Sequence, residues 1–200
     1  AKLTTSIAES GTKAHGAYFV TVERLKKTVS KQPLPAEIQD GERVVWLGSG
    51  LFERMQQHGF TETWLQSRLA GRKVSFRNLG WSGDDVWGTA RAVFGNQGDG
   101  FDRLRKDLKD ANPNLVILNF GANEASELGI SGEDFRAGLQ KLLSVIESLS
   151  ARAILVTPRA QEDLGPPYPD PTARNAHLGQ FCKIIKGEAA SRGFASVDLY

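Results

Sequence analysis

Residues 115–124 read LVILNFGANE. Four aliphatic residues come first, and Gly121 then lies between Asn119 and Asn123, two positions from each. An unbroken row of leucine, valine and isoleucine favours a strand, whereas glycine with asparagine favours a turn. We therefore expect a strand over Leu115–Gly121 with a turn of small residues at its carboxyl end. The same unit, a short strand that runs into a small-residue turn, recurs along the chain.

Four more short runs of β-branched or aromatic residues follow this pattern. We expect strands over Val44–Gly48, Val74–Gly80, Ala153–Pro158 and Ala195–Tyr200. Between the runs, apolar residues recur every three or four positions, as they do on one face of a helix. These stripes are Trp64/Leu65/Leu69, Phe101/Leu104/Leu108, Phe135/Leu139/Leu142/Leu143/Ile146 and Leu178/Phe181/Ile185/Ala189. The alternation predicts a doubly wound α/β fold, with a five-stranded parallel sheet and helices on both faces.

The composition indicates one folded domain without a polyanionic partner. The chain has 200 residues with 25 basic and 23 acidic side chains, a formal charge of +2, and the two signs are interspersed. This balance argues against nucleic acid as a partner. No stretch reaches the ~20 apolar residues that span a bilayer. We expect a polar N-terminal arm over residues 1–40, with a helix over Ala17–Val29, and one domain over residues 41–200.

Cysteine usage excludes two kinds of stabilising site. Cys182 is the only cysteine, so the chain can form neither an internal disulfide nor a thiolate zinc site. We expect no metal and no cofactor, and the single thiol gives no indication of a redox compartment.

The turns at the strand ends form the candidate site, because ligands of doubly wound sheets bind beyond the carboxyl ends of the strands. Three of these turns are rich in small residues: 48–54, 78–85 and 119–124. Glycine lets a backbone N–H point into a cleft, and an asparagine amide adds two side-chain donors. We predict that these three turns converge on one cleft at Gly50, Gly83 and Asn123, where their donors together could cradle a developing oxyanion.

Two of the turns resemble sequence blocks of the SGNH/GDSL hydrolases, a superfamily of esterases and lipases. Residues 82–84, Ser-Gly-Asp, match its second block, and residues 121–124, Gly-Ala-Asn-Glu, match the third block G-x-N-D. The resemblance covers residues 41–200 and implies the SGNH hydrolase fold, a three-layer sandwich whose five parallel strands stand in flavodoxin-like order. It also implies hydrolysis of an acyl or acetyl ester, including one linked to a carbohydrate, with the Gly83 N–H and the Asn123 amide as oxyanion donors. By the same resemblance, a secreted or periplasmic location is favoured over a cytoplasmic one.

The first block of the family, G-D-S, is altered in this chain. Gly48 matches its glycine, Ser49 takes the aspartate position and Gly50 takes the position of the nucleophilic serine. Because glycine cannot attack an ester, Ser49 is the one candidate nucleophile in this turn, and it serves equally well as the N-cap of a following helix. The alteration predicts little or no ester hydrolysis.

The last block of the family, D-x-x-H, has no counterpart before Tyr200. We expect none of the three histidines, His15, His58 and His177, to replace its general base. The last predicted strand would leave apolar surface uncovered, so we expect a second chain or another copy to cover it and to supply the block.

Two alternatives remain open from the sequence. A non-catalytic module that binds an ester or a glycan on the same scaffold explains Gly50 directly. A nucleotide- or S-adenosylmethionine-binding domain is suggested by residues 44–50, a strand followed by G-x-G. Against the second alternative, no carboxylate precedes Asp84 at the end of the second strand, and Glu53 replaces the third glycine of the fingerprint.

Overall fold

The computed structural model describes residues 2–7, 18–23, 36–126 and 129–200. The chain divides into two compact units, Ala1–Pro33 and Leu34–Tyr200. Each unit is described by itself.

The first unit is an antiparallel hairpin of strands β1 (Lys2–Ile7) and β2 (Tyr18–Glu23). The predicted helix over Ala17–Val29 is wrong for residues 18–23, and its other residues lie outside the described part of the chain. Aromatic and β-branched side chains fill most of this segment, YFVTVE, and such residues fit a strand better than a helix.

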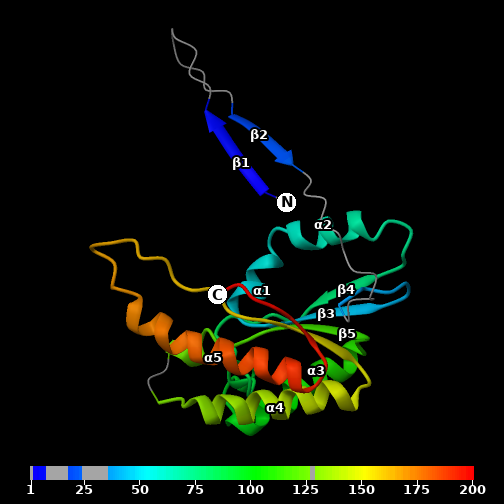
Figure 1. Ribbon diagram of the computed structural model, residues 1–200. Helices are drawn as coiled ribbons and strands as arrows, with labels where there is room; N and C mark the ends of the chain where they lie inside the picture. The colour runs from blue at the N-terminus through cyan, green and yellow to red at the C-terminus, as the bar shows by residue number, and fades with distance from the viewer. Residues whose placement is uncertain (1, 8–17, 24–35, 127–128) are drawn as a thin grey trace. The chain divides into compact units, whose positions relative to one another are not determined.

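The second unit contains the predicted sheet of five parallel strands, in the order β4-β3-β5-β6-β7 (Figure 1). The strands are β3 (Arg43–Gly48), β4 (Ser75–Asn78), β5 (Leu115–Asn119), β6 (Arg152–Val156) and β7 (Ala195–Val197). Counted along this unit, the spatial order is 2-1-3-4-5, which is the flavodoxin-like order. All five carboxyl ends therefore point to one edge of the sheet.

Five α-helices connect and cover these strands. They are α1 (Gly50–Met55), α2 (Phe60–Arg68), α3 (Gln97–Ala111), α4 (Gly132–Ser148) and α5 (Thr172–Ser191). Short 3-10 turns, η1 (Thr89–Ala92) and η2 (Glu124–Ser126), lie in the segments that follow β4 and β5. Of the helices in the described residues, none is both long and apolar enough to cross a membrane.

The two faces of the sheet carry hydrophobic clusters of unequal size. The larger cluster joins one face of the sheet to the predicted stripes of α3, α4 and α5. The smaller cluster lies on the opposite face, where Phe52 of α1 and the partly buried Leu65 and Leu69 of α2 pack. The stripe predicted on α2 is therefore only partly correct, because Trp64 is 57% exposed and α2 has no fully buried residue.

The last strand is also less buried than its pattern predicts. β7 spans only Ala195–Val197 and lies at an edge of the sheet, so the expected core strand over Ala195–Tyr200 is wrong in length and burial. Val197 is 45% exposed. Hydrophobic alternation indicates that a segment is a strand, but it does not show whether the sheet continues beyond it.

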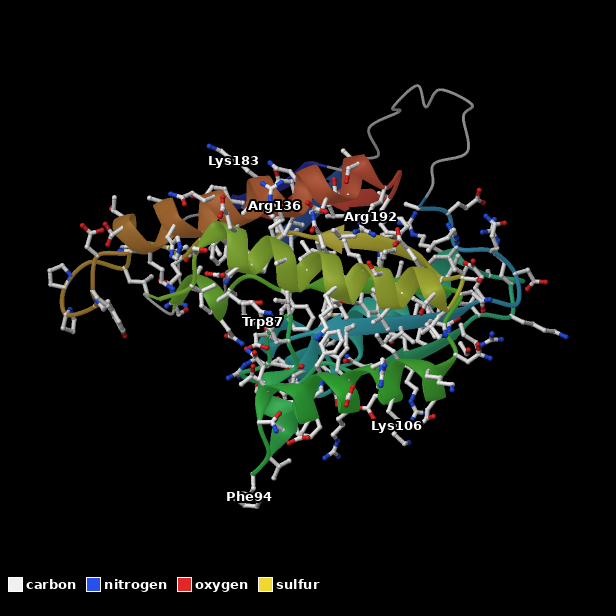
Figure 2. All side chains as sticks on the ribbon, turned by 90° about the horizontal axis from the view of Figure 1, so that it is seen from below. Trp87, Phe94, Lys106, Arg136, Lys183 and Arg192 are labelled. Carbon is white, nitrogen blue, oxygen red and sulfur yellow. The ribbon has the colours of Figure 1, made fainter. Side chains whose placement is uncertain are left out.

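The long connection from β4 to α3 carries the second predicted turn. Phe94 stands at its tip, pointing away from the second unit and fully exposed, whereas Trp87 lies against α4 (Figure 2). Asn96 then begins α3 with a reciprocal capping box to Asp99, and Ser131 begins α4 in the same way with Asp134. These caps set the first residue of α3 and of α4, and the loops that carry the second and third predicted turns end there.

Candidate active site

Backbone hydrogen bonds hold the three predicted turns side by side at the carboxyl edge of the sheet. The Trp81 N–H donates to the Gly48 carbonyl at 2.9 Å, which ties the turn after β4 to the end of β3. The Ser49 N–H donates to the Asn119 carbonyl at 3.4 Å, which ties the end of β3 to the end of β5. The parallel register thus places segments that are far apart in sequence around one opening.

A cavity of about 490 Å³ lies at this edge of the sheet. Its lining comes from the ends of β3, β5 and β6 and from the chain end: Ser49, Gly50, Leu51, Asn119, Ala122, Asn123, Pro158, Arg159 and Leu199. Gly50 and Asn123 therefore share one cavity. Gly83 is not part of the lining and lies in the adjoining turn.

Two contacts place the Gly83 turn beside the cavity. The Asn123 amide donates to the Asp84 carbonyl at 2.6 Å. On the other side, a Cβ built on Gly50 would lie 3.9 Å from the Ser82 hydroxyl oxygen. The turn is thus bordered by Asn123 and by Gly50.

Several donors at this point have no partner within the described residues. The backbone N–H groups of Gly50 and Gly83 make no hydrogen bond there. Gly83 has φ +77°, a conformation that favours glycine, and this sets the direction of its N–H. The Asn123 amide keeps one N–H free beside the one bound to Asp84. The structure thus brings the three residues together, and their use as an oxyanion hole stays a prediction.

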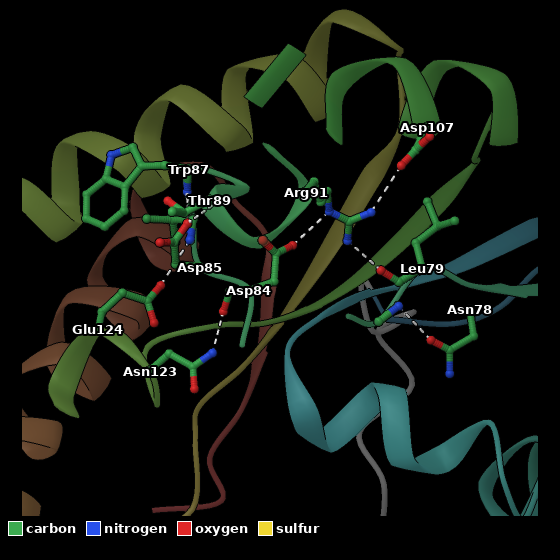
Figure 3. Close-up of polar contacts among 12 residues, drawn as sticks. Asn78, Leu79, Asp84, Asp85, Trp87, Thr89, Arg91, Asp107, Asn123 and Glu124 are labelled. Atoms are coloured by element: carbon green, nitrogen blue, oxygen red, sulfur yellow. Dashed lines mark hydrogen bonds and ion pairs between the residues drawn. The ribbon is translucent and has the colours of Figure 1, made fainter. Parts of the chain in front are cut away.

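A buried arginine fixes the turn that carries Gly83. Arg91 is 2% exposed and binds the Asp84 carboxylate at 2.8 Å, the Asp107 carboxylate at 3.1 Å and the Leu79 carbonyl at 2.6 Å (Figure 3). It therefore holds the residues on both sides of the turn. Burial raises the pKa of Asp84, and the Arg91 charge opposes that rise. One Asp84 carboxylate oxygen is buried and has no partner among the described residues.

Glu124 joins the second turn to the third. Its carboxylate accepts the Val86 N–H at 3.0 Å and the Gly121 N–H at 2.9 Å. The side chain is 1% exposed, and burial raises its pKa to about 7, although both N–H groups favour the charged form. Asp85 stands nearby and accepts the N–H groups of Trp87 and Thr89. Through these hydrogen bonds, Glu124 thus joins the backbone segment that carries Asn123 to the segment that carries the Gly83 turn.

Comparisons with known proteins show the family and the fold of the chain. Residues 47–200 match the sequence profile of the GDSL-like Lipase/Acylhydrolase family. The chain belongs to that family. No curated protein matches the chain by sequence.

Several solved structures share the fold at low sequence identity. A catalytic mutant of Axe2, an acetylxylan esterase from Geobacillus stearothermophilus, is 17% identical with a TM-score of 0.63, covering 80% of this chain and 77% of that one. TesA is 19% identical with a TM-score of 0.57, covering 78% and 77%. BT4096, a gut microbial diltiazem-metabolizing enzyme, is 16% identical with a TM-score of 0.58, covering 82% and 38%.

Membership of the GDSL-like family makes the turn after β3 the place to look for a nucleophile. Ser49 is 4% exposed, lines the cavity and makes no side-chain hydrogen bond within the described residues. It occupies the N-cap position of α1, but its side chain does not cap the helix. A Cβ would fit at position 50 without a clash, because the nearest atom to it would be the Ser82 hydroxyl oxygen at 3.9 Å.

Neither histidine in the described residues lines the cavity of this GDSL-like chain. His177 lies on α5 with its Nδ1 3.2 Å from the Ala125 carbonyl and its ring 4.7 Å from the ring of Phe181. His58 stacks on Phe60 at 5.6 Å. His15 lies outside the described residues. Within the part of the chain that the structure describes, no three side chains of the kinds that bind metals are grouped together.

Sequence reasoning missed two residues of this GDSL-like site. Arg159 lines the cavity and follows the end of β6 by three positions. Its place directly after the predicted strand Ala153–Pro158 could have identified it as a site residue. Arg91 carries no such signal, because its partners Asp84 and Asp107 belong to separate segments that only the fold brings together.

Proposed function

We propose that this chain of the GDSL-like family binds a small acyl or acetyl ester in the 490 Å³ cavity and turns it over slowly or not at all. The observation that carries the proposal is the set of unpartnered donors, the Gly50 N–H, the Gly83 N–H and one N–H of Asn123, beside a cavity whose nucleophile position is glycine. An ester linked to a carbohydrate is the first candidate ligand, because one structural neighbour is an acetylxylan esterase.

The donors suit the carbonyl oxygen of an ester. N–H groups aimed at that oxygen would polarise the carbonyl and stabilise negative charge that develops on it. Their anchors are buried: Arg91 and Glu124 fix the backbone on either side, so the donors do not have to reorganise when a ligand enters. Leu51 and Leu199, both partly exposed, give the cavity an apolar wall for an acyl or alkyl group.

Slow turnover follows from the same residues. Attack needs a nucleophile and a base within hydrogen-bond reach of it. Among the described residues, Ser49 is the only one with a hydroxyl that lines the cavity, and no histidine lines it. Recognition without efficient hydrolysis is thus the function that these residues support best.

Titration of the ¹⁵N-labelled chain with phenyl acetate tests this proposal. We expect the amide signals of Gly50 and Gly83 and the side-chain signals of Asn123 to shift with the ester, and not with phenol, which lacks the carbonyl. Asn123→Ala should weaken binding about tenfold, since loss of a hydrogen bond of this kind costs about 1–3 kcal/mol. Thermal denaturation of the variant checks that it is folded. If the three signals do not move, the proposal is wrong.

Release of nitrophenolate from p-nitrophenyl acetate gives the second readout. We expect a rate close to that of buffer alone. Ready hydrolysis that is lost in Ser49→Ala would instead establish Ser49 as a working nucleophile and overturn the binding-only proposal.

A further inference from the structure

Arg159 lies where two cavities meet. It lines the 490 Å³ cavity at the strand ends and also a second cavity of about 370 Å³. The second cavity is formed by the segment that follows β6: Arg159, Ala160, Gln161, Glu162, Leu164, Tyr168, Pro169 and Pro171. A ligand that fills the first cavity and extends into the second must therefore pass this arginine.

The backbone on both sides of Arg159 is fixed. On one side, the buried Asn119 amide donates to the Val156 carbonyl at 3.0 Å and to the Thr157 carbonyl at 3.3 Å. On the other side, the Gln161 N–H donates to the Asn175 side-chain oxygen at 2.9 Å, and the Asn175 amide donates to the Gln161 carbonyl at 2.8 Å. Only three residues separate these anchors, so the base of the arginine side chain is held beside the cavity.

Among the described residues, Arg159 is also the only charged side chain in the lining of the first cavity. Within the described residues it makes no ion pair and no hydrogen bond, whereas Arg91, Arg152 and Arg192 each bind a carboxylate. An unpaired guanidinium binds carboxylate, sulfate or phosphate groups well because it offers a planar fork of donors. In the second cavity Glu162 adds a negative charge, so an anionic ligand group is favoured on the first-cavity side of Arg159.

We propose that Arg159 selects esters that carry an anionic group a few bonds from the ester carbonyl. This inference rests on the proposed function, since it assumes that the ester occupies the first cavity. The carbonyl oxygen meets the donors of Gly50, Gly83 and Asn123, and the anionic group meets the Arg159 guanidinium at the mouth of the second cavity. The substrate class is thus an acidic ester, such as a half ester of a dicarboxylic acid.

Two esters that differ in one charged group test the inference. Monomethyl succinate presents a methyl ester and a carboxylate, and dimethyl succinate presents the same ester without the charge. By titration of the ¹⁵N-labelled chain, we expect the anionic ester to bind about five- to tenfold more tightly, a difference typical of one partly exposed charge-assisted contact. Arg159→Gln should abolish the difference, because its main effect is to weaken binding of the anionic ester.

A matched variant separates the local contact from the overall charge. Arg105→Gln removes the same charge from α3, where Arg105 pairs with Asp102 and lines neither cavity. This variant should keep the full preference for the anionic ester. A preference that is missing in the unaltered chain, or that persists in Arg159→Gln, would overturn the inference while the proposed function stands. If neither ester shifts the Gly50, Gly83 and Asn123 signals, the proposed function itself fails.

Discussion

At the scale of single residues, Glu124 is a buried carboxylate with a strongly raised pKa. Its carboxylate is buried, it bridges the Val86 and Gly121 N–H groups, and burial raises its pKa to about 7 from an ordinary value of 4.5. The folded chain therefore keeps a proton on this group at pH values where the unfolded chain has lost it. For Glu124 alone, the free energy of unfolding must fall as the pH rises from about 4.5 to about 7.

Urea denaturation at pH 5 and pH 8 measures this effect. Glu124→Gln has nearly the same shape and does not titrate, so it is the reference. Because each tenfold change in proton affinity corresponds to about 1.4 kcal/mol, the unaltered chain should lose about 3 kcal/mol relative to the variant between these pH values. A difference between the two chains that does not change with pH would contradict the burial argument.

At the residue scale, the sequence alone predicts some residues of the candidate site and misses others. Gly83 and Asn123 were located in advance because each stands in a small-residue turn directly after a strand. Arg91 was not, because its role depends on Asp84 and Asp107, which approach it only in the folded chain. A short motif thus predicts candidate donors, whereas the side chains that hold their backbone come from contacts distant in sequence.

At the scale of elements, two helical glycines give opposite expectations. A Cβ on Gly138, in α4, would lie 2.6 Å from the Trp87 Nε1 and 2.6 Å from a Val86 methyl group. A Cβ on Gly187, in α5, would meet nothing within 4 Å. Because Gly138 has no side chain, the β4–α3 connection can pack directly against α4. Gly187 has no such role.

Alanine at each position tests this difference. Gly138→Ala should lower the free energy of unfolding by about 1–3 kcal/mol, as overpacking does, and should displace Trp87. Gly187→Ala should raise it by about 0.5–1 kcal/mol, the usual gain in an exposed helix. Denaturant unfolding gives both values, and near-ultraviolet circular dichroism reports on Trp87. A neutral or stabilising Gly138→Ala would show that the contact with Trp87 is loose.

The elements differ in how well their sequence patterns predicted them. The stripes of α3, α4 and α5 were correct because their apolar residues are buried in the larger cluster on one face of the sheet. The stripe of α2 was less informative, since Trp64 and Phe60 stay exposed although they are apolar. Periodicity shows which face of a helix is apolar, but the surface that this face meets depends on the lengths and directions of the neighbouring elements.

At the scale of the whole molecule, the fold class followed from alternating strands and helices, but the strand order did not follow from any local pattern. Many orders are compatible with the same alternation, and the flavodoxin-like order was expected from the family resemblance. The sheet has this order, and the order places the end of β3 between the ends of β4 and β5. That central place is why Ser49 and Gly50 can face Asn123 on one side and the Gly83 turn on the other.

The division into two units leads to the last prediction, which concerns residues 1–33. The sheet, the cavity and all residues of both hydrophobic clusters in the described part of the chain belong to Leu34–Tyr200. A chain that begins at Leu34 should therefore unfold in one cooperative transition, with a Tm within about 2 °C of the full chain, a shift that corresponds to less than about 1 kcal/mol. Its affinity for phenyl acetate should be the same. Thermal denaturation of both chains, with and without the ester, makes the comparison. A large loss of stability would show that residues 1–33 contribute to the core, and a loss of affinity alone would show that they contribute to the site.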